Sequence, residues 1–184
     1  MDEGMDDNAV IADTRAWVDK AVIGLNLCPF AKAVQVQGRV RYVVSAAQDV
    51  ETLLYDLAAE LNALHDADPE QVDTTLLIHP QVLTDFLDYN DFLEAADALV
   101  ADIGLEGELQ VASFHPQYQF DGTAVDDITN YSNRSPYPTL HLLREASIDR
   151  AVEAFPEAEA IFETNIETLE KLGVEGWRAL GLKG

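Results

Sequence analysis

Hydrophobic residues follow two periodicities along the chain, and together they predict alternating strands and helices. Short runs of aliphatic and β-branched residues predict four strands, at 40–45, 74–78, 109–114 and 139–143. Apolar residues at helical spacing predict helices at about 14–24, 49–65 and 82–103, the last of them with a break near Tyr89 and Asn90. Two further helices are expected, one starting at Ser147 and one near Pro156.

Several residues are placed to mark the ends of these helices. Thr14 is positioned to cap the first helix, and Thr123 could cap a short helix that reaches Tyr131. Pro29 suits the first turn of a short helix that follows Cys28. Gly173 suits the position just beyond the end of a helix that reaches Lys171.

The order of the elements predicts a small α/β domain, or an α+β domain, with one mixed sheet of about four strands packed with helices. Two successive strand-helix-strand units favour three parallel strands. The fourth strand follows a connection of 23 residues at 116–138 that shows no full-length helical pattern, so we expect this strand to run antiparallel. A ferredoxin-like arrangement is the competing topology.

Length and composition predict a single domain at 9–184, preceded by a flexible acidic tail at 1–8. The tail carries four acidic residues and no apolar run, unlike a signal peptide. No segment approaches the roughly 18 apolar residues of a membrane span. The single cysteine, Cys28, cannot build a disulfide framework. We therefore expect a cytoplasmic protein.

Acidic residues dominate the composition, with 34 Asp and Glu against 11 Lys and Arg, which gives a net charge of −23. This charge repels nucleic acids and anionic membranes, so we expect neither as a partner. Four segments nevertheless contain no acidic residue: 20–48, 74–84, 109–120 and 128–144. Buried strands also exclude carboxylates, which explains part of this pattern. The first and fourth of these acid-free segments contain long stretches outside strands, and there we predict a site for an anion.

The tripeptide His-Pro-Gln occurs twice, starting at His79 and at His115, each time directly after a predicted strand. In open α/β sheets, ligands bind outside the carboxyl ends of the strands. If the two strands are neighbours, both imidazoles face one crevice, where either could act as a general acid or base near neutral pH. The alternative is that each His-Pro pair simply ends a strand.

Cys28 precedes the short helix expected from Pro29 onward. The positive end of a helix and the nearby Lys32 would both lower the pKa of its thiol and favour a nucleophilic thiolate. The alternative is a small buried hydrophobic residue, because Leu27 and Phe30 flank it.

The segment 133–145 holds the densest group of polar side chains. Arg134 could grip a carboxylate or phosphate through its planar fork, aided by Arg144, while Ser135 could add a hydroxyl and Tyr137 could stack or donate. His141 lies within the last predicted strand, on the face opposite to Leu140 and Leu142. The alternative is an ordinary Asn-Arg-Ser-Pro turn with Arg144 in a structural ion pair.

A metal site could combine His79, His115 and His141 with Cys28 or Asp121, although no two of these residues have the close spacing usual for zinc ligands. The chain lacks the glycine-rich, Walker, HExxH and GxSxG motifs, which argues against common nucleotide-binding, metalloprotease and hydrolase classes. No pattern indicates a particular cofactor or oligomeric state.

Three blocks of sequence resemble a bacterial family known as domain of unknown function 1415. They are residues 25–31 with Trp17, the His-Pro-Gln-Tyr block from His115 to Phe120, and the Asn-Arg-Ser-Pro-Tyr-Pro block from Asn133 to Pro138 with His141 to Glu145. The resemblance spans nearly the whole chain. It implies a bacterial single-domain protein and assigns no catalytic role to any residue.

Our first hypothesis is an enzyme that acts on a small anionic substrate, a carboxylate or phosphate, in a crevice at the carboxyl ends of the strands. Cys28, His79 and His115 would be the catalytic residues. The substrate would bind to Arg134, Ser135, Tyr137, His141 and Arg144. A second hypothesis is a non-catalytic protein that binds a small anion or a metal. A third is a protein-interaction module whose partner surface consists of Tyr118, Phe120, Tyr131 and Tyr137.

Overall fold

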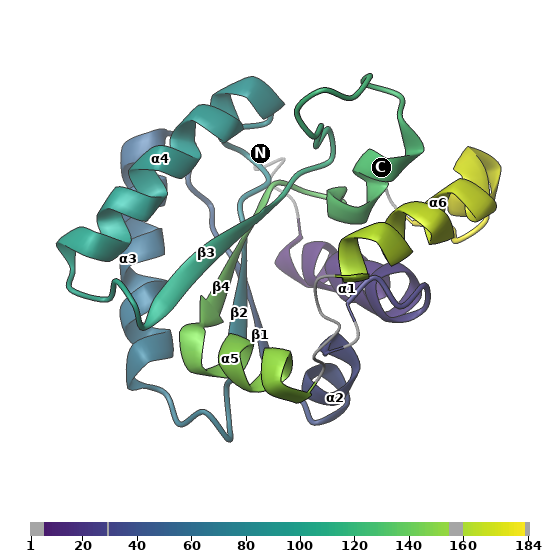
Figure 1. Cartoon of the computed structure of the whole chain (residues 1–184). Helices are drawn as coiled ribbons and strands as arrows, with labels where there is room; N and C mark the ends of the chain where they lie inside the picture. Colours follow the sequence, from purple (N-terminus) through teal and green to yellow (C-terminus); the bar gives the residue numbers. More distant parts are fainter. Residues whose placement is uncertain (1–5, 29, 155–159, 183–184) are drawn as a thin grey trace.

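A four-stranded sheet lies between two layers of helices in the computed structural model, which describes residues 6–28, 30–154 and 160–182 (Figure 1). All four predicted strands are present. In chain order the elements are α1 (Asp7–Trp17), the π-helix η1 (Val18–Ile23), α2 (Ala31–Val36), β1 (Val40–Val44), α3 (Val50–Asp66), β2 (Thr74–Ile78), α4 (Phe86–Asp102), β3 (Leu109–Phe114), the 3₁₀-helix η2 (Ile128–Asn133), β4 (Thr139–Arg144), α5 (Glu145–Ala154) and α6 (Ile161–Arg178).

The strands are ordered β1-β2-β4-β3 across the sheet. Only β1 and β2 form a parallel pair, while β4 is antiparallel to both of its neighbours, β2 and β3. The mixed sheet of four strands is confirmed, but the predicted group of three parallel strands is wrong. β3 points in the same direction as β1 and β2, but it does not pair with either of them. After α4 the chain leaves one strand position empty next to β2 before β3 begins. β4 fills that position and makes backbone hydrogen bonds along both of its edges.

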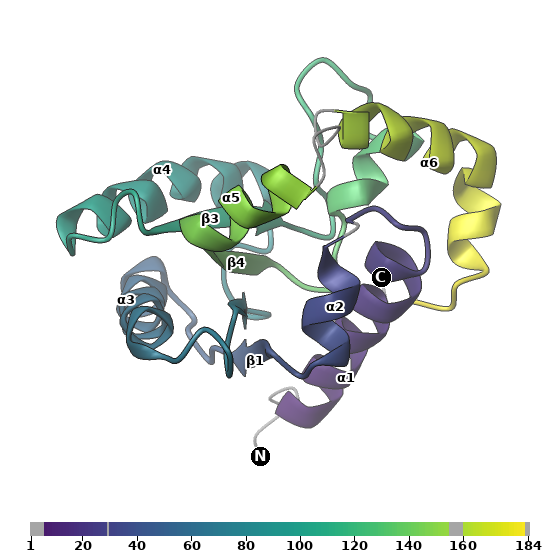
Figure 2. The same ribbon diagram turned by 60° about the horizontal axis from the view of Figure 1, so that its bottom comes forward.

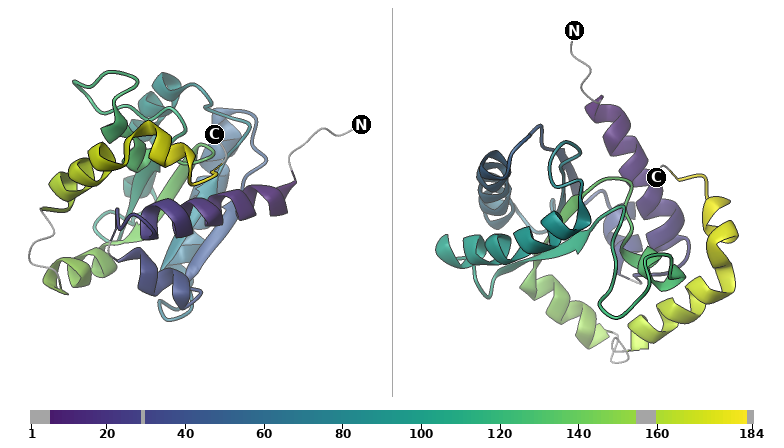
Figure 3. Two further views of the ribbon diagram at one scale, coloured as in Figure 1. Left: turned by 90° about the vertical axis from the view of Figure 1, so that its right-hand side faces the viewer. Right: turned by 90° about the horizontal axis from the view of Figure 1, so that it is seen from above.

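Helices cover both faces of the sheet. α3 and α4 pack on one face, and α1, η1, α2, α5 and α6 lie on the other (Figure 1, Figure 3). Side chains alternate along β4, so Leu140 and Leu142 face α3 and α4, whereas His141 faces the second layer. The alternation predicted for His141 is therefore present.

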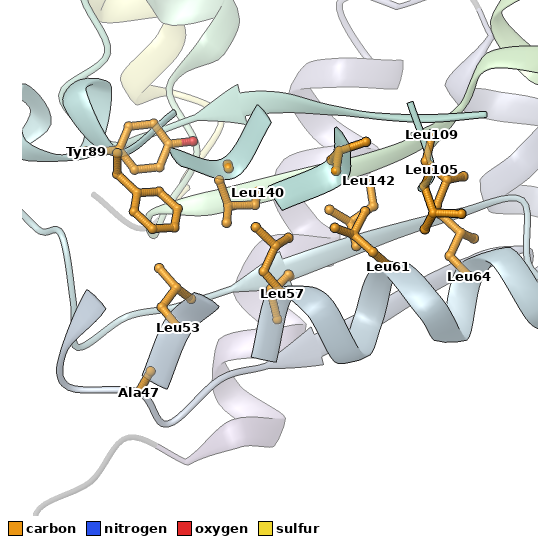
Figure 4. Packing of buried hydrophobic residues seen from close by; sticks show 14 of the residues in the cluster. Ala47, Leu53, Leu57, Leu61, Leu64, Tyr89, Leu105, Leu109, Leu140 and Leu142 are labelled. Carbon is orange, nitrogen blue, oxygen red and sulfur yellow. The ribbon is translucent and has the colours of Figure 1, made fainter. Parts of the chain in front are cut away.

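The core on the α3 side is built from leucines at helical spacing. Leu53, Leu57, Leu61 and Leu64 are each at most 1% exposed and point from α3 toward the leucines of the sheet (Figure 4). Fully burying a leucine contributes about 1.5–3 kcal/mol. This row of leucines therefore holds the helix against the strands. Because the buried leucines recur at helical spacing, the sequence pattern predicted α3 well.

α1 begins earlier than predicted. Its N-cap is Asp6, whose carboxylate accepts the backbone N–H two residues further on, and the helix starts at Asp7. The hydroxyl of Thr14, the expected cap, instead donates to the carbonyl oxygen of Val10 inside the helix. The helix therefore extends into the predicted acidic tail, because an aspartate caps as well as a threonine and Val10 is buried.

α4 begins at Phe86, later than predicted, and continues without a break through Tyr89. The preceding turn contains Leu83 with a φ of 59°, a left-handed conformation that ends any helical path. The side chain of Asp85 then accepts the backbone N–H of Leu87 and caps the new helix.

The long connection between β3 and β4 contains η2, which Asp127 caps, in place of the predicted helix capped by Thr123. The hydroxyl of Thr123 instead hydrogen-bonds with the carbonyl oxygen of Phe120 and with Oδ1 of Asn130. Asn130 is fully buried and also bonds to the backbone of Phe120 and Ala124, so it organises this connection.

The predicted helix positions of Pro29 and Pro156 lie outside the described residues. Gly173 has a φ of 68° at a kink within α6, which agrees with the helix end expected there. Across the described ranges, the helices are too short or too polar to span a membrane.

Candidate functional site

The two His-Pro-Gln motifs place their histidines against one residue of α4, although β2 and β3 are not the sheet neighbours that the shared crevice required. The rings of His79 and His115 both contact Tyr89 of α4, with centroid distances of 5.8 and 4.9 Å. Both histidines are fully buried. The end of the sheet where a crevice was expected is therefore occupied by packed side chains.

Hydrogen bonds fix the tautomer of His115, that is, which ring nitrogen carries the proton. The backbone N–H of Gln117 donates to its Nδ1 at 3.0 Å, so the proton lies on Nε2, which donates to the carbonyl oxygen of Leu83 at 3.0 Å. Nδ1 of His79 lies 3.0 Å from the carbonyl oxygen of Val82. Burial lowers the pKa of both residues, that of His79 to about 4. Both are therefore neutral near pH 7, and they hold the strained turn before α4.

The side chains predicted to bind an anion around Arg134 bond to the protein itself. Nε of Arg134 donates to the carbonyl oxygen of Tyr118 at 3.0 Å, and Nη2 donates to that of Val125 at 2.6 Å. The guanidinium also lies 4.6 Å from the ring centroid of Tyr131. Ser135 donates to the carbonyl oxygen of Tyr137. Arg134 therefore stabilises the connection between β3 and β4.

Tyr137 and Arg144 are also occupied by internal partners. The hydroxyl of Tyr137 donates to Asp13 of α1 at 2.6 Å. Nη2 of Arg144 donates to the carbonyl oxygen of Ala67, which caps the end of α3, and to that of Val72 in the connection to β2. Neither side chain lines the cavity that contains Cys28 and His141.

The aromatic residues of the long connection pack against one another and against α6. The Tyr118 and Phe120 rings lie 4.9 Å apart, Phe120 lies 6.1 Å from Phe162, and Tyr131 lies 5.2 Å from Trp177. Of the aromatic surface considered for an interaction module, Tyr118, Phe120 and Tyr131 are thus half-buried within this layer, and Tyr137 is buried elsewhere.

A cavity of about 650 Å³ lies on the other face of the sheet, and we call it the sheet-face cavity. Its volume is typical of small-molecule sites, which span about 300–1,000 Å³. Its floor is formed by side chains of all four strands, and its walls come from α1, η1, α2 and α5, which lie on the same side of the sheet (Figure 2). Apolar side chains line most of it, including Trp17, Val18, Val22, Phe114 and Ile148.

Two of the predicted site residues line this cavity, Cys28 and His141. Burial raises the pKa of the Cys28 thiol, while hydrogen bonds from the backbone N–H groups of Phe30 and Ala31 act in the opposite direction. The thiol is thus held at the start of α2, as predicted, but burial outweighs the stabilisation of a thiolate.

His141 is held by Thr74 on the neighbouring strand. The hydroxyl of Thr74 donates to the carbonyl oxygen of Leu142 at 2.6 Å, so it accepts from Nε2–H of His141 at 2.8 Å. Among the described residues, Nδ1 of His141 has no hydrogen-bond partner. Burial lowers the pKa of His141 to about 4, although Asp73 opposes the shift. The cavity therefore contains a neutral imidazole with an unoccupied acceptor nitrogen.

One part of the cavity wall carries charged residues that the sequence did not single out. Ser147 Oγ donates to Asp73 Oδ1 at 2.7 Å, and Arg150 Nη2 donates to Ser147 Oγ at 3.3 Å. Arg39 Nη2 lies 3.5 Å from the same Asp73 oxygen. We call Arg39, Asp73, Ser147 and Arg150 the polar wall. The signals available in the sequence were Arg39 within an acid-free segment and the pair Ser147 and Arg150 at helical spacing.

The acid-free segments supply thirteen of the twenty-one residues that line the cavity. The first segment contributes most of them, including Cys28 and Arg39, and the last contributes His141 and Leu143. Asp73 is the one acidic residue in the lining. The acid-free segments therefore supply most of the cavity lining.

The metal hypothesis required the histidines to converge. His141 faces the opposite side of the sheet from His79 and His115, so the three predicted ligands are separated. Within the described ranges, no cluster of three or more His, Cys, Asp or Glu residues could hold a metal ion.

A family model described as "Protein of unknown function (DUF1415)" matches residues 9–179. The match covers most of the 184 residues, so the chain belongs to this family. Comparisons with curated proteins and with solved structures gave no match.

Proposed function

We propose that this member of the DUF1415 family binds a small, largely apolar molecule in the sheet-face cavity. The observation that carries the proposal is a cavity of about 650 Å³ whose walls are mainly apolar and which contains Cys28 and His141. Water gains few hydrogen bonds in such a space, whereas an apolar ligand would release it and gain dispersion contacts.

The packing of two helices supports this proposal. α2 and α5 contain no fully buried residue. Ala31 and Val34 of α2, and Ile148, Ala151 and Val152 of α5, line the cavity instead. A ligand in the cavity would give these apolar side chains the contacts that the protein core does not supply.

Fluorescence titration with the uncharged apolar probe N-phenylnaphthylamine tests the proposal. Ala151→Phe places a ring in the cavity, whereas Ala98→Phe places the same ring on the exposed surface of α4, across the sheet. We expect Ala151→Phe to weaken binding about tenfold or more, since the ring occupies the ligand's volume. Ala98→Phe should bind like the wild type. Equal affinity in all three proteins, or no binding to the wild type, would overturn the proposal.

A second candidate function is catalysis in the same cavity with Cys28 as nucleophile, favoured because His141 lines the cavity with it. His141 Nδ1 would accept the thiol proton as the sulfur attacks the carbonyl carbon of an ester. The bond from that carbon to the ester oxygen would then break, and the departing alcohol would take the proton from His141. Mass spectrometry after incubation with aryl esters of apolar acids tests this role. An acyl adduct on Cys28 that is lost in Cys28→Ser and slowed in His141→Gln is expected. An unmodified Cys28 would exclude catalysis and leave the binding proposal intact.

A further inference from the structure

We propose that the ligand of the sheet-face cavity carries an anionic oxygen group, a carboxylate or a phosphate, that binds at the polar wall. This inference rests on the proposed binding function and specifies the ligand as an amphiphile. Its apolar part would contact Trp17, Val22 and Phe114, and its charged group would lie against Arg150.

The charge of the cavity differs from that of the whole chain. The charged residues of the lining are Arg39, Asp73 and Arg150, two cations and one anion, in a chain with a net charge of −23. Arg144 lies nearby and adds a third cation. Burial is the main cause that lowers the pKa of Arg144. The positive charges of Arg150 and Arg39 lower it further, whereas the negative charges of Asp73 and Asp68 oppose the shift. The guanidinium groups thus outnumber the carboxylates that could neutralise them.

The two arginines of the polar wall differ in how much bonding capacity they retain. Nε and Nη2 of Arg39 donate to the carbonyl oxygen of Pro69, and Nη1 donates to Gln37. Arg150 makes a single bond, to Ser147, and forms no ion pair with any residue in the described ranges. A guanidinium has five N–H donors, so most donors of Arg150 remain available for a bidentate anion.

Ser147 and Asp73 orient Arg150 without neutralising it fully. Ser147 accepts a hydrogen bond from Arg150 and donates one to Asp73, which is only 8% exposed and lies 3.5 Å from Arg39. Asp73 is therefore shared between the two arginines. A ligand anion would supply the second negative charge that the polar wall lacks.

Isothermal titration calorimetry with decanoate, decyl phosphate and decanol tests the inference, because the three share an apolar chain and differ in their headgroup. Arg150→Gln removes the charge of the exposed arginine. Arg178→Gln is the matched control, since it changes the net charge equally on an exposed residue at the end of α6. Asp73→Asn removes the competing carboxylate and keeps an acceptor for Ser147.

We expect one or both anions to bind more tightly than decanol. Arg150→Gln should weaken anion binding about fivefold and leave decanol unaffected, as fits a solvent-exposed charge pair. Asp73→Asn should have the opposite effect and tighten anion binding, an outcome that mere loss of structure would not produce. Arg178→Gln should match the wild type.

The outcomes separate the two proposals. Equal affinity for decanol and both anions, unchanged by either substitution, would overturn the anionic headgroup while the cavity proposal stands. Absence of binding by all three compounds, together with failure of the uncharged probe, would overturn both. Preference for decyl phosphate over decanoate, or the reverse, would identify the kind of anion.

Discussion

At the scale of single residues, partners determine whether a polar side chain is structural or available to a ligand. Arg134 and Arg150 have the same side chain. Arg134 donates to two backbone carbonyl groups and stacks on Tyr131, so its guanidinium is committed to the fold. Arg150 is exposed, and within the described part of the chain it makes one bond, to Ser147. The sequence favoured Arg134, because it lies among other polar residues, but that segment is a folded connection.

Exchanging each arginine for glutamine should separate these roles. Arg134→Gln should lower the free energy of unfolding by about 1–2 kcal/mol, because it loses bonds to the carbonyl oxygens of Tyr118 and Val125. It should leave the affinity for decanoate unchanged. Arg150→Gln should weaken decanoate binding and leave the free energy of unfolding unchanged. Urea denaturation and calorimetry on both variants provide the measurements, and weaker ligand binding by a fully stable Arg134→Gln would restore Arg134 as a binding residue.

At the scale of elements, hydrophobic periodicity located all four strands and the main helices, but it could not give the strand order. Leu140 and Leu142 show that β4 has a buried face, yet the same pattern fits an edge strand or a central one. The position of β4 depends on the backbone edges that β2 and β3 leave open. That information is absent from the local sequence, so the prediction of three parallel strands failed.

The π-helix η1 is a second feature that periodicity did not reveal. The backbone N–H of Gly24 donates to the carbonyl oxygen of Asp19, five residues earlier, at 3.0 Å. This wide turn ends the helix that supplies Val18 and Val22 to the cavity wall. A side chain at Gly24 would collide with the backbone carbonyl group of Lys20. The position therefore requires glycine for close packing, although its φ is an ordinary −59°.

Gly24→Ala should consequently destabilise the protein by at least about 2 kcal/mol, since the rigid backbone of η1 must move. Gly176→Ala is the matched comparison. Its new methyl group would meet only the side chain of Leu172, which can change rotamer, so we expect a cost of about 1 kcal/mol or less. Thermal unfolding followed by circular dichroism gives both values. Equal costs for the two variants would show that η1 adapts to a side chain.

At the scale of the whole molecule, the acid-free segments contribute more residues to the cavity lining than any single motif does. Two of the predicted site residues, Cys28 and His141, line it. Asp73 and Arg150 were missed because only folding brings them together. Pairing of β2 with β4 sets Thr74 opposite Leu143, which places the residue before β2 next to the start of α5. The paired His-Pro-Gln motifs suggested a crevice with two histidines. The same tripeptide can also recur because two strands end against the same helix, as β2 and β3 do at α4.

Buried histidines should make the stability of the whole molecule depend on pH. The pKa values of His79 and His141 are about 4 in the folded chain, below the ordinary value of about 6.5 expected after unfolding. Between these values the unfolded chain binds more protons than the folded one. Stability from these groups is therefore fully present above about pH 6.5 and is lost as the pH falls toward 4. Protonation of the many carboxylates relieves repulsion and acts in the opposite direction.

Comparing wild type with His141→Gln isolates one histidine from that background. Glutamine can still donate to Thr74 but cannot take up a proton in this range. Urea denaturation from about pH 8 to about pH 4.5 should show the wild type losing roughly 2–3 kcal/mol more than the variant, because the other titrating groups are common to both. The two curves of unfolding free energy against pH should converge on the acidic side, where protonation of the imidazole favours the unfolded chain. Parallel curves across this range would mean that His141 is already charged, or freely hydrated, in the folded protein.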